Sequence, residues 1–309
     1  MNDSAAASPT LYVIGGINID LIVGKIAEWP RRGTEILLAD SECRAGGSAA
    51  NTALAFAALG GRCRTIANVG ADMFGRFLAD AFEDSAAWRR TACPTTITIG
   101  VSHSDGERTL LTTRGHLAAF SLNDVLEQLP ARAAAGDVAL LCCPFLEPLL
   151  LERFETLLGI LVERGFAVAL DTGWPPEGWT TAIRAQVEAW LPYCRHVLLN
   201  EIETLGLADM AELDQAVARL RRRLPPDATM VVKRGREGAA AWRRDRHVER
   251  PARSVQVVDT IGAGDIFNAG YLDGEMRGLP LDAALALGIE VACRAISTHP
   301  RRYAVPASD

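Results

Sequence analysis

Short apolar runs alternate with helical patterns along this chain, and that alternation restricts its fold more than any other feature. The runs predicted as strands are Leu11–Ile14, Arg64–Ala67, Val138–Cys142, Ala167–Asp171, His196–Leu199 and Met230–Lys233. The segments predicted as helices are Ser48–Leu59, Met73–Asp84, Pro148–Arg164, Leu213–Leu224, Ala263–Met276 and Leu281–Ser297. Such alternation is typical of a mainly parallel sheet with helices on both faces. We therefore expect an α/β fold, with residues 1–309 forming a single domain because no linker of domain-separating length occurs.

Two β-leaning segments interrupt the alternation. Residues 20–45 lie between the first predicted strand and the first predicted helix. Residues 95–113 hold two runs rich in Thr, Ile and Val, joined by the turn-like sequence Ser104-Asp105-Gly106. The second segment is typical of a hairpin. Surface decoration would account for both, but both adjoin polar residues at strand ends, so we predict a small β lid.

Composition excludes several classes of protein. Hydrophobic residues make up 49% of the chain, enough for a buried core, and the net charge of −6 disfavours nucleic acid as a partner. No apolar run approaches the roughly 18 residues needed to cross a bilayer. The first ten residues do not resemble a secretory signal. Cys142 and Cys143 end an apolar run and are interpreted as core thiols, so we expect a cytoplasmic protein without membrane contact.

A glycine-rich turn opens one of the predicted helices. Val255–Val258 is predicted as a strand, and Gly262, Ala263 and Gly264 lie between it and the acid Asp265. Backbone N–H groups at a helix start favour an anion such as a phosphoryl group. A carboxylate repels such an anion as a ligand but is well placed to take a proton from an attacking hydroxyl. The alternative is a helix-start acid next to a simple turn.

Polar or glycine-rich residues follow several other predicted strands, where open parallel sheets bind their ligands. They are Asn18 and Asp20, Gly46, Gly47 and Asn51, Asn200 and Glu203, and Lys233, Gly235 and Gly238. Each has a structural alternative. Asn18 suits a turn, the Gly46-Gly47 pair suits a tight turn before a helix, and Asn-x-x-Glu is also a helix-capping pattern. Gly235 and Gly238 suit a hairpin turn leading to Ala239–Trp242.

Several of these motifs resemble those of ribokinase-like (PfkB) carbohydrate kinases. The run from Asp259 to Asp265, with Phe267, Gly270 and Leu272 in register, is similar to the C-terminal signature of that family. The other matching motifs are Gly46-Gly47 with Asn51, Asn68 to Gly75, Asn200 with Glu203, and Lys233 to Ala239. The matches follow the family's order between residues 13 and 272, so the resemblance covers nearly the whole chain.

The resemblance implies a ribokinase-like fold, with a central, mainly parallel sheet, flanking helices and a small β-sheet lid formed by about 20–45 and 95–113. It implies transfer of the γ-phosphate of ATP to a hydroxyl of a small sugar or sugar derivative. Asp265 would be the general base, and Gly262, Ala263 and Gly264 would form the anion hole. It also implies a homodimer formed through the lid.

The resemblance further assigns residues to each ligand. The sugar would contact Asn18, Asp20, Gly46, Gly47 and Asn51. The nucleotide would contact Asn200, Lys233, Gly235 and Gly238, while Glu203 would bind Mg²⁺ through water. Asp259 and nearby backbone carbonyls would hold a monovalent cation such as K⁺.

Departures from the family pattern leave some points open. Ser48 stands where ribokinases carry lysine, which disfavours ribose, and Ile261 replaces a common threonine, which leaves K⁺ activation open. Asp171 matches a residue in another segment of the family, and Gly173 stands where that segment often has asparagine. Arg114 is interpreted equally as a phosphate contact or a surface residue. Glu147 is interpreted as a helix start rather than a substrate contact.

Three other functions were considered. A nucleoside kinase of the same fold fits every motif, and a non-catalytic sugar sensor would be expected to have lost the acid or the anion site. A dinucleotide-dependent oxidoreductase is disfavoured because Gly15-Gly16-Ile17-Asn18 does not supply G-x-G-x-x-G.

Overall fold

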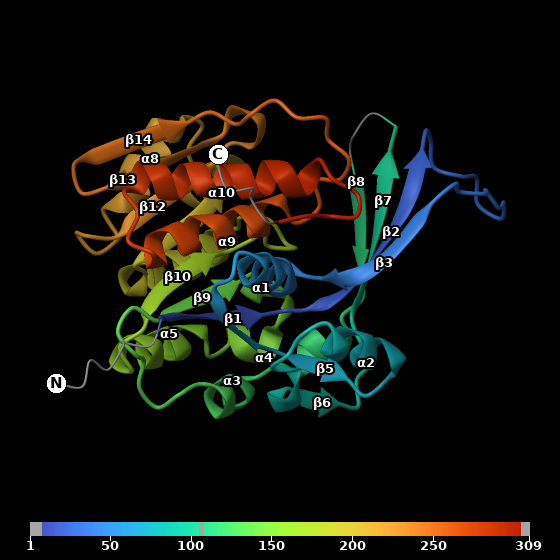
Figure 1. The fold of residues 1–309 in the computed structure, drawn as a ribbon, viewed down its shortest axis with the longest axis horizontal. Coiled ribbons are helices and arrows are strands. Elements are labelled where there is room, and N and C mark those ends of the chain that lie inside the picture. The colour runs from blue at the N-terminus through green and yellow to red at the C-terminus, as the bar shows by residue number, and fades with distance from the viewer. Residues whose placement is uncertain (1–7, 105–107, 304–309) are drawn as a thin grey trace.

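The computed structural model describes residues 8–104 and 108–303, and its centre is an eight-stranded sheet (Figure 1). The strand order is β14-β13-β12-β11-β10-β9-β1-β4. The strands are β1 (Thr10–Gly15), β4 (Arg62–Ile66), β9 (Val138–Cys142), β10 (Ala167–Asp171), β11 (His196–Asn200), β12 (Thr229–Lys233), β13 (Ala239–Arg243) and β14 (Arg246–Arg250). All neighbours from β4 to β12 are parallel, and β13 and β14 are added antiparallel. The predicted mainly parallel sheet is confirmed.

Helices cover both faces of this sheet (Figure 1). On one face pack α1 (Ser48–Ala58), α9 (Ala263–Met276) and α10 (Leu281–Ile296). On the other pack α5 (Phe154–Glu163), α6 (Thr181–Trp190), α7 (Glu201–Ala208) and α8 (Leu213–Arg221). Side chains alternate between the two layers, so Val13 packs in the first core and its neighbour Ile14 in the second. Both faces of the central strands are buried, which explains why β1, β9, β10, β11 and β12 are mainly apolar.

The remaining elements are short. They are the helices α2 (Met73–Asp80), α3 (Leu122–Gln128) and α4 (Pro148–Leu151), a two-stranded sheet of β5 (Asn68–Gly70) and β6 (Arg89–Thr91), and 3₁₀ turns at Ser85–Ala87, Gly115–Ala119, Pro144–Leu146, Leu191–Tyr193 and Gly235–Glu237. Within the described residues, no helix is long and apolar enough to span a membrane.

A second, four-stranded sheet forms the lid and projects from the side of the main body (Figure 1). Its order is β3-β2-β7-β8, with β2 at Asn18–Ile26, β3 at Ser41–Gly46, β7 at Ile97–His103 and β8 at Arg108–Thr112. The pair β7–β8 is the predicted hairpin. Of the predicted turn, Asp105 and Gly106 lie outside the described residues.

Some predicted elements were wrong. Val255–Val258 is not a strand: it lies in the loop between β14 and α9, with Val257 and Val258 more than half exposed and no neighbouring strand. The helix predicted at Met73–Asp84 ends at Asp80. The helix predicted at Pro148–Arg164 is two helices, because the N–H of Arg153 bonds the carbonyl of Leu150 and tightens the turn between them.

Candidate active site

Five strands of the main sheet end near one edge in two level groups, and this arrangement assembles the site. Gly15 of β1 is level with Cys142 of β9, which is level with Asp171 of β10. Asn200 of β11 is likewise level with Lys233 of β12. Residues far apart in the sequence therefore meet along one edge, where parallel sheets bind ligands.

A cavity of about 270 Å³ lies beside this edge, under the lid. The predicted site residues that line it are Asn18, Asp20, Gly47, Asn51, Gly262 and Asp265. The lid contributes Thr98, Leu110 and Thr112, and the residues after β9 contribute Cys143, Leu146 and Glu147. The structure thus brings the predicted sugar contacts and the predicted base around one space.

Asp265 lies in the first turn of α9 and faces α1. Its Oδ2 accepts a hydrogen bond from Asn51 Nδ2 at 3.0 Å, and its carbonyl accepts one from Thr52 Oγ1 at 3.1 Å. Burial, and secondly the charge of Asp171, raise the pKa of Asp265 to about 6. The carboxyl is therefore mostly ionised at neutral pH yet more basic than an ordinary aspartate, as a general base should be.

The helix start beside Asp265 presents backbone donors. Gly262 precedes α9 with φ of 75°, a left-handed conformation that glycine adopts without strain. The N–H of Ala263 donates to the carbonyl of Thr260 at 3.2 Å. Among the described residues, the N–H groups of Gly264 and Asp265 have no acceptor, so these two are available to an anion. We call residues 259–265 the GAGD loop.

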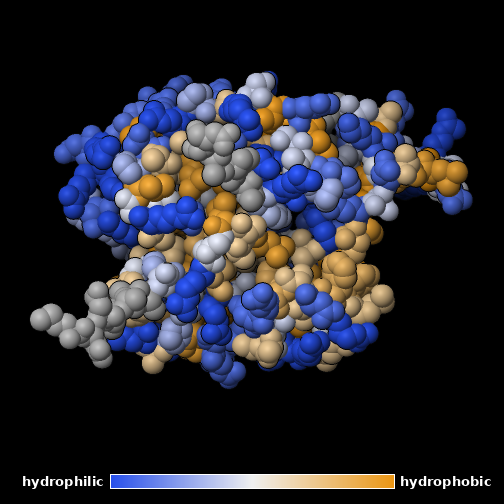
Figure 2. Space-filling view, viewed as in Figure 1, coloured by the Kyte–Doolittle hydropathy of each residue, from blue (hydrophilic) through white to orange (hydrophobic). Residues whose placement is uncertain are grey.

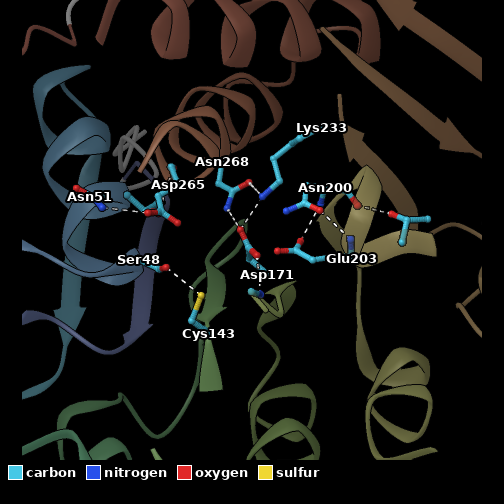
Figure 3. A network of polar contacts seen from close by, with 12 residues as sticks. Ser48, Asn51, Cys143, Asp171, Asn200, Glu203, Lys233, Asp265 and Asn268 are labelled. Atoms are coloured by element: carbon cyan, nitrogen blue, oxygen red, sulfur yellow. Dashed lines mark hydrogen bonds and ion pairs between the residues drawn. The ribbon is translucent and has the colours of Figure 1, made fainter. Parts of the chain in front are cut away.

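A buried ion pair lies next to the GAGD loop (Figure 3). Lys233 Nζ donates to Asp171 Oδ2 at 2.7 Å and to Asn268 Oδ1 at 3.3 Å. Burial alone would lower the pKa of Lys233, but Asp171 and Glu203 hold it above its usual value. A Cβ built on Gly264 would lie 3.3 Å from Lys233 Nζ, so a permanent positive charge sits against the helix start.

Asn200 and Glu203 form the helix-capping pair that the sequence offered as an alternative. The N–H of Glu203 donates to Asn200 Oδ1, and the N–H of Asn200 donates to Glu203 Oε2, both at 2.8 Å. Burial, and secondly Asp171, raise the pKa of Glu203 to about 7. The described residues hold no cluster of three or more His, Cys, Asp or Glu side chains able to enclose a metal ion.

The geometry of the predicted sugar-binding residues explains why Gly46 and Gly47 are glycines. Asn18 Nδ2 donates to Asp20 Oδ1 at 2.8 Å, and both side chains are buried. A Cβ on Gly46 would lie 2.0 Å from Asp20 Cγ, and a Cβ on Gly47 would lie 2.6 Å from Asn18 Oδ1. Real Cβ atoms do not approach so closely, so the glycine pair is what allows the two polar side chains to occupy their places.

Two cavity residues follow β9. Glu147 starts α4 as interpreted from the sequence, but its side chain does not cap the helix: it is 1% exposed, and among the described residues neither carboxyl oxygen has a hydrogen-bond partner. Burial raises its pKa to about 8. Cys142 is a core thiol as predicted, whereas Cys143 lines the cavity with its Sγ 2.9 Å from Ser48 Oγ. Cys143 and Glu147 both come shortly after β9, and a position just beyond a core strand was the sequence signal that could have placed them in the cavity.

Several predicted residues do not line the cavity, among them Gly235, Gly238 and Arg114. Gly235 and Gly238 form the turn of the β12–β13 hairpin, and Gly238 is required there because a Cβ would lie 2.0 Å from the carbonyl oxygen of Arg250. Arg114 is exposed, in agreement with its interpretation as a surface residue.

Asp259 does not fit a monovalent-cation site in this structure. Its Oδ2 accepts from Arg44 Nη2 at 2.6 Å and from Arg301 Nη2 at 2.5 Å, and its Oδ1 accepts from the N–H of Ile261 at 2.8 Å. The carboxylate is therefore already matched by two guanidinium groups.

The helix-covered sheet, the small second sheet and the cavity between them define a ribokinase-like protein. Residues 8–307 match the model described as "pfkB family carbohydrate kinase". The chain belongs to this family: it is a sugar kinase, a phosphotransferase with an alcohol group as acceptor, and the prediction of an enzyme is confirmed.

Curated and solved relatives agree with this assignment. A protein named fructokinase from Klebsiella pneumoniae is 34% identical over 279 residues, covering 85% of this chain and 89% of the relative. The structure of Arabidopsis thaliana ribokinase complexed with ribose and ATP superposes with a TM-score of 0.73 at 22% identity, covering 94% of this chain and 93% of that one. Adenosine kinase from Sinorhizobium meliloti gives 0.78 at 23%, covering 97% of each. At these identities the two solved structures establish the fold alone.

Proposed function

We propose that this enzyme transfers the γ-phosphate of ATP to a hydroxyl of a small sugar, with Asp265 as the general base. The observation that carries the proposal is the position of Asp265. The carboxylate lines the cavity under the lid, next to free N–H groups at the start of α9, and the polar pair Asn18 and Asp20 lines the same cavity. A base, an anion site and a polyol-sized space thus meet at one point.

The sugar is held by polar groups that line the same cavity as Asp265. Asn18 and Asp20 offer amide and carboxylate oxygens to its hydroxyl groups, and Asn51 adds an amide. We add Glu147 to this set, because a pKa of about 8 keeps its carboxyl protonated at neutral pH and able to donate a hydrogen bond. Gly46 and Gly47 act by leaving room for Asp20 and Asn18.

The chemical step uses the ionised form of Asp265. Its carboxylate removes the proton from the attacking hydroxyl as the oxygen–phosphorus bond forms, and the bond from phosphorus to the departing ADP oxygen breaks. The N–H groups of Gly264 and Asp265 stabilise the charge on the transferring group, together with the positive end of the α9 dipole. The ammonium group of Lys233, which is paired with Asp171, lies against the same helix start.

The nucleotide lies over the ends of β11 and β12 in this proposal, contacting Asn200, Lys233, Gly235 and Gly238. Burial, and secondly the negative charge of Asp171, raise the pKa of Glu203 to about 7, and a divalent cation nearby would favour its ionised form. Hydrated Mg²⁺ needs few protein carboxylates, so Glu203 fits as a ligand through water. When bound there, Mg²⁺ would neutralise charge on the phosphates.

The acceptor class follows from the relatives. Fructokinase is the name of the Klebsiella relative and of a second one from Salmonella typhimurium that is 30% identical over 280 residues, so a ketohexose is the first acceptor to test. The nucleoside kinase alternative rests on fold likeness and is tested in the same screen. We further propose a cytoplasmic homodimer, supported by seven unpaired cysteines and by exposed apolar residues on the lid.

A coupled ADP-release assay with Mg·ATP tests the proposal against fructose, other sugars, sugar acids and nucleosides. We expect turnover with a sugar and a loss of about 10²- to 10⁴-fold in kcat for Asp265→Asn. Asp273→Asn, the same change on the same helix but outside the cavity, is the matched control and should retain activity. Undiminished turnover by Asp265→Asn would refute the assigned base, and turnover of nucleosides alone would refute the assigned acceptor.

A further inference from the structure

The GAGD loop is tied to two arginines from distant parts of the chain. Arg44 comes from lid strand β3, and Arg301 comes from the segment after α10, and their side chains are 16% and 8% exposed. Figure 1 shows this C-terminal segment, in red, running from α10 towards the lid. Both guanidinium groups donate to Oδ2 of Asp259.

Arg301 also reaches the loop backbone. The same Nη2 that donates to Asp259 donates to the carbonyl oxygen of Ile261 at 2.8 Å. Ile261 directly precedes Gly262, whose left-handed conformation starts α9. One positively charged nitrogen therefore joins a carboxylate and a carbonyl on either side of Thr260, as a bound metal cation would.

Two guanidinium groups already donate to the carboxylate oxygen of Asp259 that a cation would need. Arg44 also pairs with Glu42 at 3.2 Å, and the nearby Asp20 interacts electrostatically with both arginines. Although burial opposes it, the Ile261 N–H and both arginines hold the pKa of Asp259 below its usual value. A monovalent cation bound to Asp259 would have to displace a guanidinium group or lie close to two of them, and like charges repel.

We propose that Arg301 is a built-in cation that replaces a monovalent metal ion in positioning the GAGD loop, so that this kinase needs no K⁺. Arg301 is a positioning residue: it orders Asp259 and the Ile261 carbonyl, and through them the N–H groups of Gly264 and Asp265. Arg44 brings the lid strand β3 to the same carboxylate. The expected K⁺-independence of turnover rests on the proposed function, whereas the occupation of the cation position by Arg301 does not.

The first test varies the cation at constant ionic strength. The wild-type enzyme is assayed for ADP release in KCl and in tetramethylammonium chloride, each at about 0.1 M. We expect kcat to differ by less than about twofold, whereas Arg301→Ala should lose roughly 10- to 100-fold, somewhat less than direct loss of an anion-hole donor. K⁺ or guanidinium ion should restore part of the activity of Arg301→Ala.

Two variants separate positioning from folding. Arg301→Lys keeps the positive charge and should retain much more activity than Arg301→Ala without added K⁺. Arg302→Ala removes the exposed neighbouring arginine, which makes no ion pair among the described residues, and should behave as wild type. Strong K⁺ activation of the wild type, or full activity of Arg301→Ala without K⁺, would overturn the proposal.

A readout without turnover keeps the inference independent of the proposed reaction. Thermal unfolding of the protein without substrates is followed with and without K⁺. We expect K⁺ to leave the wild-type melting temperature unchanged and to raise that of Arg301→Ala, because only the variant has an open site. A K⁺-dependent rise in the wild type would contradict the inference, whereas failure to release ADP with any acceptor would contradict only the proposed function.

Discussion

The neighbours of Asp265 shift its pKa in opposite directions, so the pH dependence of activity should report on its environment. Burial and Asp171 raise the value, while the hydrogen bond from Asn51 lowers it, leaving a pKa of about 6. A base must be ionised to accept a proton, so activity is lost on the acid side.

We expect kcat/KM to be flat near neutral pH and to fall about tenfold per pH unit below about pH 6. Asn51→Ala removes the hydrogen bond that favours the carboxylate, so its midpoint should move to higher pH. Asn68→Ala, a buried asparagine that bonds the carbonyl of His116 instead, should leave the midpoint in place. A wild-type midpoint near 4, the usual aspartate value, would contradict the buried position described for Asp265.

Glu147 should affect stability as well as binding. Its pKa is raised from the usual 4.5 to about 8 in the folded protein, so the unfolded chain loses this proton first as pH rises. The folded state is therefore destabilised progressively between these two values, on the order of 2 kcal/mol or more at pH 8 relative to pH 5.

Glu147→Gln removes that penalty and should raise the free energy of unfolding at pH 8 much more than at pH 5. Urea unfolding at both pH values measures the difference. Glu163→Gln, at the end of α5 and outside the cavity, is the control and should show no such pH-dependent gain. Equal effects of Glu147→Gln at both pH values would show that the carboxyl is not buried as described.

At the scale of elements, the strand ends could be predicted and the contacts between them could not. The predicted strands Ala167–Asp171, His196–Leu199 and Met230–Lys233 end at, or one residue before, the polar side chains of Asp171, Asn200 and Lys233, because buried parallel strands are continuous apolar runs that end where polar residues begin. Val255–Val258 has the same composition but no neighbouring strand, so the pattern failed there. The Asp259–Arg301 contact joins residues that no local pattern relates, and the side-chain direction of Glu147 depends on tertiary packing.

The glycine pair that connects β3 to α1 has a testable role. Gly46→Ala would put a Cβ 2.0 Å from Asp20 Cγ, so Asp20 must move and the KM for sugar should rise about tenfold or more, while the KM for ATP changes little. Gly159→Ala in α5 has no atom closer than 3.9 Å and should be neutral or stabilising by up to about 1 kcal/mol. An unchanged sugar KM for Gly46→Ala would remove Asp20 from the proposed binding set.

At the scale of the whole molecule, apolar side chains gather at the end of the lid (Figure 2). Leu37 is 93% exposed, next to the exposed Ile36 and Leu38, and Leu111 of β8 is 51% exposed. Exposed apolar patches of this kind mark association surfaces. This observation supports the proposed homodimer.

Light scattering after size exclusion should give a mass near twice that of one chain. Leu37→Asp and Leu111→Asp should shift the protein towards the monomer, because each places a charge on the proposed contact. Leu149→Asp on α4, which is 46% exposed but away from the lid, should not. A monomeric wild-type protein at micromolar concentration would end the dimer proposal.

The two edge strands of the eight-stranded sheet, β4 and β14, affect how copies of this chain can associate. β4 carries Arg62 and Arg64 along one border, and β14 carries Arg246 and Arg250 along the other. A strand from a second molecule added at either border would bring like charges together across the new ladder and desolvate them, which protects such borders from edge-to-edge aggregation. Continuous sheet extension is therefore disfavoured at both borders. Self-association confined to the lid would then stop at a closed pair and would not propagate into fibres.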